Sequence, residues 1–359
     1  MNEINPTSGR RRVLSGMRPT GKLHLGNYMG ALYNWVRLQQ EYECFFFIAD
    51  YHALTTDYAD TSQLRENIHQ VALDFLAAGL DPEQCTIFRQ YHVPAHAELY
   101  ALLANITPLS WLERVPSYKD QQEQLKEKDL ATFGFLGYPL LQSADILVYQ
   151  PTFVPVGQDQ AAHVEITREI ARRFNFLYPR AGDLPVEPRR TLPEHMQSPA
   201  VLDPILPEPQ VLLTPSPKLP GTDGRKMSKS YGNTILLSDT EATIRAKLKT
   251  MVTDPARVRR TDPGNPDVCP VFDLHKVFSS PEIQQEARAG CESAGIGCIQ
   301  CKGWVADAIV RELAPIQERR LRYEANPALV TEILRAGAVR ANERANQTMR
   351  EVSAAMGLD

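Results

Sequence analysis

Two lysines lie three residues apart in the stretch TDGRKMSKSYGN, residues 222–233. Lys226 and Lys229 are bracketed by Gly224 and Gly232, a pattern that favours a loop over a helix. A solvated basic turn is one explanation. The other is a mobile loop that closes two ammonium groups over phosphates and balances the negative charge of a leaving pyrophosphate. We call this segment the lysine loop; the rest of the chain decides between the two explanations.

The stretch TGKLHLGN, residues 20–27, is also suited to phosphate, and we call it the glycine turn. It follows a strand-like run at 13–16 and precedes a helical pattern that opens at Leu25 or Gly26. Such a turn directs backbone N–H groups and the positive end of a helix dipole toward an anion, and His24 lies at its entrance. Together with the lysine loop, it predicts a nucleotide-phosphate site.

The glycine turn and the lysine loop resemble the two ATP signatures of the class I aminoacyl-tRNA synthetases. The first signature ends in Asn27 rather than His, which is typical of the tryptophanyl enzymes. The resemblance to bacterial tryptophanyl-tRNA synthetases covers nearly the whole chain. It is carried by SGMRPTGKLHLGNYMGAL (15–32), GYPLLQSADILVYQ (137–150), VPVGQDQAAHVEITREIARRFN (154–175) and PIQERR (315–320).

The resemblance implies an ATP site with catalytic groups at its phosphate end. The implied catalytic residues are His24, Asn27, Lys226 and Lys229. The implied ATP-binding residues are Arg18, Pro19, Thr20, Gly26, Asn27, Gly157, Gln158, Asp159, Leu219, Lys226, Met227, Ser228, Lys229 and Ser230.

The resemblance also implies a tryptophan site formed by Asp145, Tyr138, Gln142 and Gln160. Asp145 matches the carboxylate that accepts the indole N–H, and a buried acceptor left unpaired would reject analogues that lack this donor. The residues alone support Asp145 only in part, because a carboxylate within apolar LLQSADILVY needs a partner that a cap or an ion pair would equally provide.

The implied reaction needs little covalent help from the protein. The carboxylate of tryptophan attacks the α-phosphorus of ATP, Mg²⁺ stabilises the leaving pyrophosphate, and the acyl group then passes to tRNA(Trp). The family is homodimeric, and by analogy the segment at about 90–135, which includes Trp111, would supply part of the dimer interface and the acceptor-stem contact.

Four of the six cysteines fall late in the chain, at Cys269, Cys291, Cys298 and Cys301. Because disulfides are rare in the cytoplasm, four thiols ending in C-x2-C favour a metal site, with zinc and an iron–sulfur cluster as level alternatives and unligated thiols as a lesser one. A subset of tryptophanyl enzymes holds a [4Fe–4S] cluster with almost this spacing, so the resemblance favours the cluster over zinc. Cys44 and Cys85, in strand-like runs, are predicted to be core residues.

The bulk composition is that of an ordinary protein with two domains. The chain has 359 residues, 43% of them hydrophobic, a formal net charge of -4 and no apolar run long enough to cross a membrane. Together with a start that lacks the apolar core of a signal peptide, this predicts a cytoplasmic protein without a membrane segment. The charge argues against a general nucleic-acid binder but allows a local basic patch.

Alternating strand and helix patterns predict an α/β fold with a parallel sheet covered by helices. Strands are predicted at 13–16, 44–50 and 85–90 and a helix at 61–80, while the proline-rich segment 179–220 suggests a surface crossing. We predict a Rossmann-type nucleotide-binding domain over 1–235 and a smaller helical anticodon-binding domain with the cysteine site over 236–340. The last helix, 341–359, is expected to pack on the first domain.

Three alternatives remain open. Gln142, where many tryptophan enzymes have Met, and Tyr138 would favour a tyrosyl-tRNA synthetase. A non-catalytic RNA-binding paralogue that carries the cluster is opposed by the two intact ATP signatures. A nucleotidyltransferase that shares the fold would leave the helical third of the chain unexplained.

Overall fold

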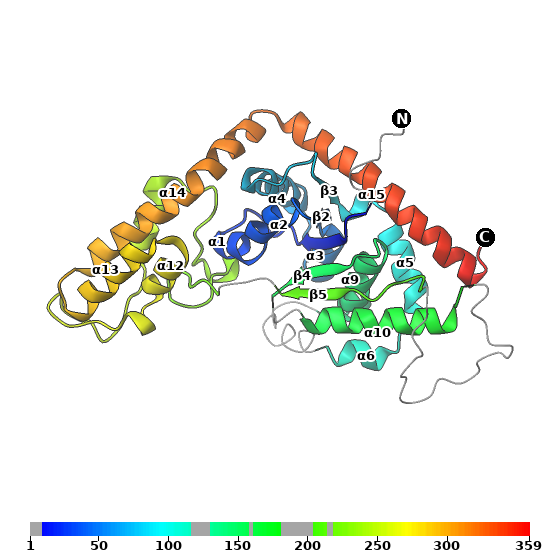
Figure 1. Ribbon diagram of the computed structural model, residues 1–359, viewed down its shortest axis with the longest axis horizontal. Helices are drawn as coiled ribbons and strands as arrows, with labels where there is room; N and C mark the ends of the chain where they lie inside the picture. The colour runs from blue at the N-terminus through cyan, green and yellow to red at the C-terminus, as the bar shows by residue number, and fades with distance from the viewer. Residues whose placement is uncertain (1–8, 116–129, 158–160, 181–203, 214–217) are drawn as a thin grey trace.

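The computed structural model describes residues 9–115, 130–157, 161–180, 204–213 and 218–359. In these residues one parallel sheet has the order β3-β2-β1-β4-β5. Its strands are β1 (Arg12–Met17), β2 (Glu43–Ile48), β3 (Cys85–Arg89), β4 (Phe153–Val156) and β5 (Gln210–Leu213). The strand order reverses beside β1, and in open α/β sheets ligands bind beyond the carboxyl ends of the strands at such a point. The predicted Rossmann-type sheet is confirmed (Figure 1).

The three strands predicted from apolar runs are confirmed as β1, β2 and β3. Strands of a parallel sheet are buried on both faces, so their sequences are continuously apolar, and Phe45, Phe46 and Phe47 of β2 are all buried. β4 and β5 lie where no strand was predicted. Pro155 interrupts the apolar pattern of β4, and β5 lies within the proline-rich segment that suggested only a surface crossing.

The connection from β1 to β2 is an interrupted helix. It consists of α1 (Leu25–Asn27), the π-helical turn η1 (Tyr28–Leu32) and α2 (Tyr33–Leu38). The predicted start at Leu25 is confirmed, whereas the π-helical turn was not predicted. The glycine turn precedes this helix, and Gly21 adopts a φ of 97°, a left-handed conformation that glycine adopts readily.

Helices pack on both faces of the sheet and create the two larger apolar clusters of the described residues. The first cluster includes Trp35 of α2, which stacks on Phe46 of β2 with ring centroids 4.7 Å apart, and Phe75 of α4 (Leu64–Ala78). The second cluster includes Phe45 and Tyr149 and involves helices on the other face of the sheet.

The remaining elements of the α/β body are α3 (Asp50–Asp57), η2 (Gln90–His92), α5 (Ala95–Ala104), α6 (Leu109–Glu113), α8 (Phe133–Leu136), α9 (Tyr138–Leu147) and α10 (Ala161–Leu177). Cys44 and Cys85 are buried core residues, as predicted.

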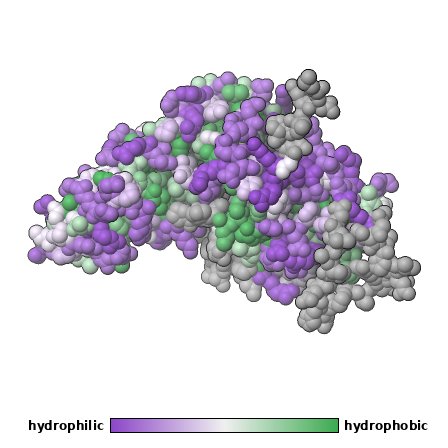
Figure 2. All heavy atoms as spheres, in the orientation of Figure 1, coloured by the Kyte–Doolittle hydropathy of each residue, from purple (hydrophilic) through white to green (hydrophobic). Residues whose placement is uncertain are grey.

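After β5 the described chain is helical, as predicted. Its elements are η4 (Lys229–Tyr231), α11 (Glu241–Thr250), η5 (Pro266–Val268), α12 (Pro270–Phe278), α13 (Pro281–Glu292), α14 (Cys298–Glu324) and α15 (Pro327–Met356). Figure 1 shows α12, α13 and the start of α14 as an arm beside the α/β body, and α14 returns from the arm to that body. Figure 2 shows apolar side chains gathered in the hollow between arm and body on an otherwise mostly hydrophilic face.

The last helix, α15, packs against β3 and α5. Its apolar stripe, which includes Leu334, Ala341 and Val352, is buried. At Gly337 the helix meets the backbone of β3 directly, because a Cβ built there would overlap the carbonyl oxygen of Ile87. The domain boundaries at 235 and 340 stay predictions. None of the described helices is long and apolar enough to cross a membrane.

Candidate functional site

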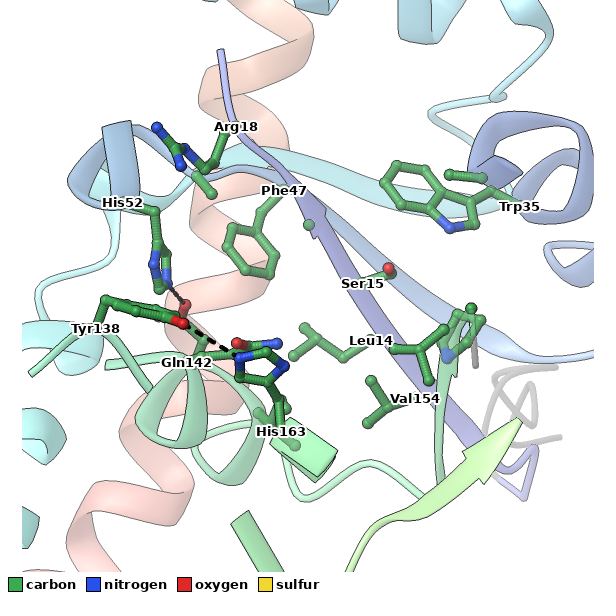
Figure 3. A pocket seen from close by; sticks show the side chains of 18 of the residues that line it. Leu14, Ser15, Arg18, Trp35, Phe47, His52, Tyr138, Gln142, Val154 and His163 are labelled. Atoms are coloured by element: carbon green, nitrogen blue, oxygen red, sulfur yellow. Dashed lines mark hydrogen bonds and ion pairs between the residues drawn. The ribbon is translucent and has the colours of Figure 1, made fainter. Parts of the chain in front are cut away.

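A cavity of about 450 Å³ opens beyond the carboxyl ends of β1 and β4, a volume within the range of small-molecule sites. Ser15 and Gly16 of β1, Val156 of β4 and residues of α9 line it. Figure 3 shows His52, Tyr138, Gln142 and His163 grouped on one side and Trp35 on the other. The strand order places the cavity where the direction of winding reverses, as expected for a nucleotide-binding α/β sheet.

Asp145 of α9 lines the cavity but is only 1% exposed, and three side chains bind its carboxylate. His52 Nε2 lies 2.7 Å from Oδ2, while Gln90 Nε2 and His96 Nδ1 lie 2.7 Å and 2.6 Å from Oδ1. Burial raises the pKa of Asp145, but attraction to and hydrogen bonds from His52 and His96 outweigh burial and hold the pKa at about 2. The carboxylate is therefore ionised at neutral pH and accepts a hydrogen bond from each neighbour.

The ionised carboxylate is part of a longer hydrogen-bond chain. Because Asp145 can only accept, His96 donates from Nδ1. The other ring nitrogen of His96, Nε2, lies 2.9 Å from the Tyr149 hydroxyl. Each carboxylate oxygen has two acceptor positions, and His52 uses one of those on Oδ2. In the described residues, His52 is the side chain that binds Oδ2.

Sequence reasoning predicted that Asp145 needs a partner but missed the three partners. They come from α3, η2 and α5, which the chain reaches 93, 55 and 49 residues before Asp145. No periodic pattern relates residues from three separate elements. Polar residues directly after the buried runs that form β2 and β3 were the available signal, since the carboxyl ends of parallel strands meet at one edge.

His24 forms the N-cap of α1 rather than an open anion site. Its Nδ1 accepts from the backbone N–H groups of Gly26 and Asn27 at 3.1 and 3.3 Å, and Asn27 Oδ1 accepts from His24 N at 3.1 Å. Burial, together with the charges of Lys229 and Lys226, lowers the pKa of His24 to about 4. The ring is therefore neutral at pH 7, with its proton on Nε2, which can donate to a phosphate oxygen.

The lysine loop meets the glycine turn through Lys229. Its ammonium group donates to the carbonyl oxygens of Thr20 and Gly21 at 3.0 and 2.8 Å and lies 3.2 Å from Thr20 Oγ1. Burial lowers the pKa of Lys229 to about 8, which the charge of Asp74 partly opposes. Lys226 is exposed on the same loop. The two predicted phosphate-binding segments therefore form one site.

Asn233 stabilises the conformation of the lysine loop through hydrogen bonds of its side-chain amide. Its Nδ2 donates to Asp223 Oδ1 at 2.6 Å, and its Oδ1 accepts from Ser228 N at 2.8 Å. Met227 is buried beneath the loop, and its backbone N–H donates to Leu219 O at 2.9 Å. Leu219 is therefore a buried support of this loop, whereas Ser230 is exposed.

The other predicted site residues fall into three groups. Arg18, Tyr138, Gln142 and Gly157 line the cavity, and Arg18 Nη2 donates to Thr56 Oγ1 at 2.5 Å. Pro19 lines a separate cavity of about 440 Å³ beside it. Gln158, Asp159 and Gln160 lie outside the described residues, so their predicted roles stay predictions.

The four late cysteines lie in one region of the arm. Cys269 is the N-cap residue directly before α12, Cys291 lies in the last turn of α13, and Cys298 and Cys301 lie in the first turn of α14. Burial, together with the other three thiols, raises the pKa of Cys301 to about 12. In the described residues, however, no group of three or more His, Cys, Asp or Glu side chains could hold a metal ion as placed. The predicted metal site is thus not supported by the structure.

The fold, the joined phosphate-binding segments and the cavity with its buried carboxylate define a class I synthetase. The sequence profile of the family described as tRNA synthetases class I (W and Y) matches residues 7–314. The tryptophan–tRNA ligase of Ralstonia nicotianae is 51% identical, covering 97% of this chain and 98% of its own length. That of Thermotoga maritima is 49% identical, with 97% and 99% covered. The chain therefore belongs to the tryptophan–tRNA ligase family of class I tRNA synthetases.

Solved structures of related synthetases support the same family assignment. The tryptophanyl-tRNA synthetase of Campylobacter jejuni, complexed with ADP and tryptophan, has a TM-score of 0.81 at 33% identity, covering 97% of this chain and all of that one. A tyrosyl-tRNA synthetase of Archaeoglobus fulgidus has a TM-score of 0.61 at 21% identity, which supports the shared fold alone.

Proposed function

We infer that this chain activates L-tryptophan with ATP and transfers it to tRNA(Trp). One observation carries the inference: Lys229 of the lysine loop contacts the glycine turn beside His24, so both ATP signatures form a single phosphate site. The nearby cavity holds an ionised carboxylate, an acceptor for a ring N–H. Relatives at up to 51% identity carry the same activity in their names.

Activation proceeds by in-line displacement at the α-phosphorus of ATP. A carboxylate oxygen of tryptophan forms the new bond to phosphorus, the bond to the bridging oxygen breaks, and pyrophosphate leaves. Lys229, Lys226 and the Nε2–H of His24 supply positive charge and a hydrogen bond where pyrophosphate gains negative charge. A hydroxyl of the 3′-terminal ribose of tRNA then attacks the acyl carbon and AMP leaves. Positioning supplies much of the rate in both steps.

Mg²⁺ is expected to enter with ATP. Of the described residues that line the cavity, Asp145 is the sole carboxylate, and His52, His96 and Gln90 already bind it. These residues do not fit a protein-held Mg²⁺ site. Phosphate oxygens, which Mg²⁺ prefers, are the remaining ligands, and the ion would offset their charge.

Asp145 is also suited to tryptophan as the substrate. An ionised carboxylate is matched by the indole N–H, a donor that cannot accept. Gln142, which had pointed toward tyrosine, lies on the cavity wall together with Tyr138. The direct test is amino-acid-dependent ATP–pyrophosphate exchange with tryptophan and tyrosine side by side, followed by charging of tRNA(Trp). Exchange with tryptophan alone is expected; exchange with tyrosine would overturn the role of Asp145, and no exchange with either would favour the non-catalytic paralogue.

A [4Fe–4S] cluster at Cys269, Cys291, Cys298 and Cys301 is a further part of the proposal, with zinc as the alternative. Its support is the spacing, the mutual effect of the thiols on their ionisation, and the cations Arg257 and Lys302 beside them. Against it stands the placement of the side chains, which form no metal-holding group in the described residues. Anaerobic purification with iron, sulfide and zinc assays tests it. Near four iron and four sulfide per chain would support the cluster, and stoichiometric zinc or no metal would overturn it.

A homodimer in the cytoplasm, where ATP and tRNA are available, completes the proposal. Large apolar side chains are exposed within the described part of the segment at about 90–135, among them Tyr91, Leu109 and Phe133. A cavity of about 310 Å³ lined by Tyr51 and Tyr100 lies on the same part of the molecule. Light scattering after size-exclusion chromatography tests the dimer, and a monomer at micromolar concentration would exclude it.

The proposed domain boundaries lie near residues 235 and 340. Limited proteolysis tests them, because cleavage is expected to concentrate at exposed connections between domains.

A further inference from the structure

The segment PIQERR, residues 315–320 of α14, lies outside the cavity and the two phosphate-binding segments. It lies on the return path of α14 from the arm to the α/β body (Figure 1). Gln317 Nε2 donates to the carbonyl oxygens of Leu237 and Asp239 at 3.1 and 2.8 Å. Leu237 N in turn donates to Leu23 O at 2.9 Å. α14 thus holds the chain that follows the lysine loop where that chain pairs with the glycine turn.

Arg320, at the end of the same segment, reaches the glycine turn through a buried carboxylate. Its Nη1 pairs with Asp74 Oδ1 of α4, and its Nη2 donates to Gln70 Oε1. The side chain of Asp74 is 0% exposed and that of Arg320 is 3% exposed. The second oxygen of Asp74 accepts from Leu23 N at 2.7 Å, directly before His24. One carboxylate therefore connects α14 to the backbone that presents the catalytic histidine.

Another contact fixes the other side of His24. The Tyr28 hydroxyl donates to Glu312 Oε1 of α14 at 2.7 Å, eight residues before Arg320. Leu23 and Tyr28 thus bracket the N-cap of α1, and both depend on α14. Because α14 spans Cys298–Glu324, about 40 Å at 1.5 Å per residue, one continuous helix links the cysteine region to this bracket.

The alternative is that the ion pair between Asp74 and Arg320 only stabilises the fold and has no effect on activation. A buried ion pair is weak evidence for stability, since its desolvation can exceed its attraction, and an apolar pair of similar volume is often as stable. Asp74 differs from such a pair because it also accepts the N–H of Leu23. An apolar replacement would restore packing but would leave this N–H unpaired and the glycine turn without its tie to α14.

We propose that Asp74 and Arg320 are positioning residues for tryptophan activation, which hold Leu23 and His24 in register with the lysine loop through α14. The proposal rests on the activity inferred above. Neither residue is expected to touch substrate. Their loss displaces catalytic groups at the phosphate end while leaving the tryptophan cavity intact.

The test compares wild type with Arg320→Met, Arg320→Lys and the double variant Asp74→Leu/Arg320→Met in ATP–pyrophosphate exchange. Arg322→Met is the matched control, because Arg322 is exposed and pairs with Glu318 of its own helix. Since a misplacement of 1 Å can cost about 100-fold, kcat is expected to fall about 10- to 100-fold in Arg320→Met with the KM for tryptophan within about twofold. Arg320→Lys should recover part of kcat, and Arg322→Met should match wild type.

The double variant separates positioning from stability. Its melting temperature is expected to recover toward wild type, while kcat stays low. Recovery of kcat together with stability, or an unchanged kcat in folded Arg320→Met, would overturn the proposal. Wild-type protein without tryptophan-dependent exchange would instead mean that the proposed function is wrong, so the two failures are distinguishable.

Discussion

Lys229 Nζ lies 2.8 Å from the carbonyl oxygen of Gly21, although 208 positions separate the two residues. The contact places an ammonium group against backbone carbonyls of the glycine turn, where phosphate oxygens of ATP would compete for it. The lysine loop therefore lies directly against the glycine turn. Binding of ATP would exchange carbonyl acceptors for charged ones, which strengthens each hydrogen bond.

The Lys229 contact predicts a pH dependence. Burial lowers the pKa of Lys229 to about 8 in the free protein, so kcat/KM for ATP, which reports the free enzyme, should fall about tenfold per pH unit well above pH 8. Lys229→Arg should be slower at pH 7 but lack this decline, because a guanidinium stays charged. Exchange rates from pH 6.5 to 9.5 measure both. An identical decline in wild type and Lys229→Arg would mean that a group other than Lys229 causes it.

Removing the charge of Asp145 should weaken tryptophan use strongly. In Asp145→Asn, an amide replaces an acceptor that faces His52, His96 and Gln90, so at least one buried donor loses its partner. The indole N–H would also lose its charged acceptor at a cost of about 1–3 kcal/mol, which predicts a fall in kcat/KM for tryptophan of about 10- to 100-fold. The control is Asp273→Asn at an exposed pair with Lys276. An unaltered kcat/KM would exclude Asp145 as the tryptophan reader.

Variants of His24 should separate its capping role from its catalytic one. His24→Asn keeps an N-cap acceptor, whereas His24→Ala loses about 1 kcal/mol of unfolding free energy. Both should lose activation, because neither reproduces the Nε2–H donor toward phosphate. Denaturant unfolding and pyrophosphate exchange on the same preparations provide the comparison. Full activity in His24→Asn would mean that His24 acts only as the N-cap of α1 and has no catalytic role.

The low pKa of His24 also predicts how stability changes with pH. Its pKa of about 4 in the folded protein lies below its ordinary value of 6.5, so the unfolded chain binds more protons between these values. The stabilisation from neutral His24 is complete above about pH 6.5 and is lost as pH falls toward 4. Wild type should therefore lose more unfolding free energy from pH 7 to pH 5 than His24→Asn. Parallel losses would contradict the assignment.

Two glycine substitutions test how closely α15 packs. An alanine Cβ at Gly337 would overlap the Ile87 carbonyl oxygen and lie 2.7 Å from its carbonyl carbon, so backbone has to move. Gly337→Ala is expected to cost about 1–3 kcal/mol of unfolding free energy, as overpacking does. Gly303→Ala in α14, where no described atom lies within 4 Å, should gain about 0.5–1 kcal/mol from helix propensity. Thermal and denaturant unfolding measure both; equal effects would mean α15 packs loosely.

The sequence allowed prediction of local elements where one pattern dominates. The run CFFFIA predicts β2 because a strand buried on both faces is continuously apolar, and the stripe from Leu334 to Val352 predicts a helix. The π-helical turn at Tyr28–Leu32 was missed, because it follows no recognisable residue pattern. The partners of Asp145 and the link from Arg320 to Leu23 were also missed. Both join residues from separate elements, and only the assembled fold brings them together.

The contact between α15 and β3 has a consequence for the chain before synthesis is complete. β3 is the outermost strand on its side of the sheet, and an open strand is a template for pairing with another molecule. α15 removes that template, because Gly337 lies on the Ile87 backbone and Arg340 donates to the carbonyl of Pro82, just before β3. Until the last thirty or so residues leave the ribosome, β3 is exposed to intermolecular association. The final helix thus protects the completed chain from aggregation, and a truncation near residue 326 would leave β3 open permanently.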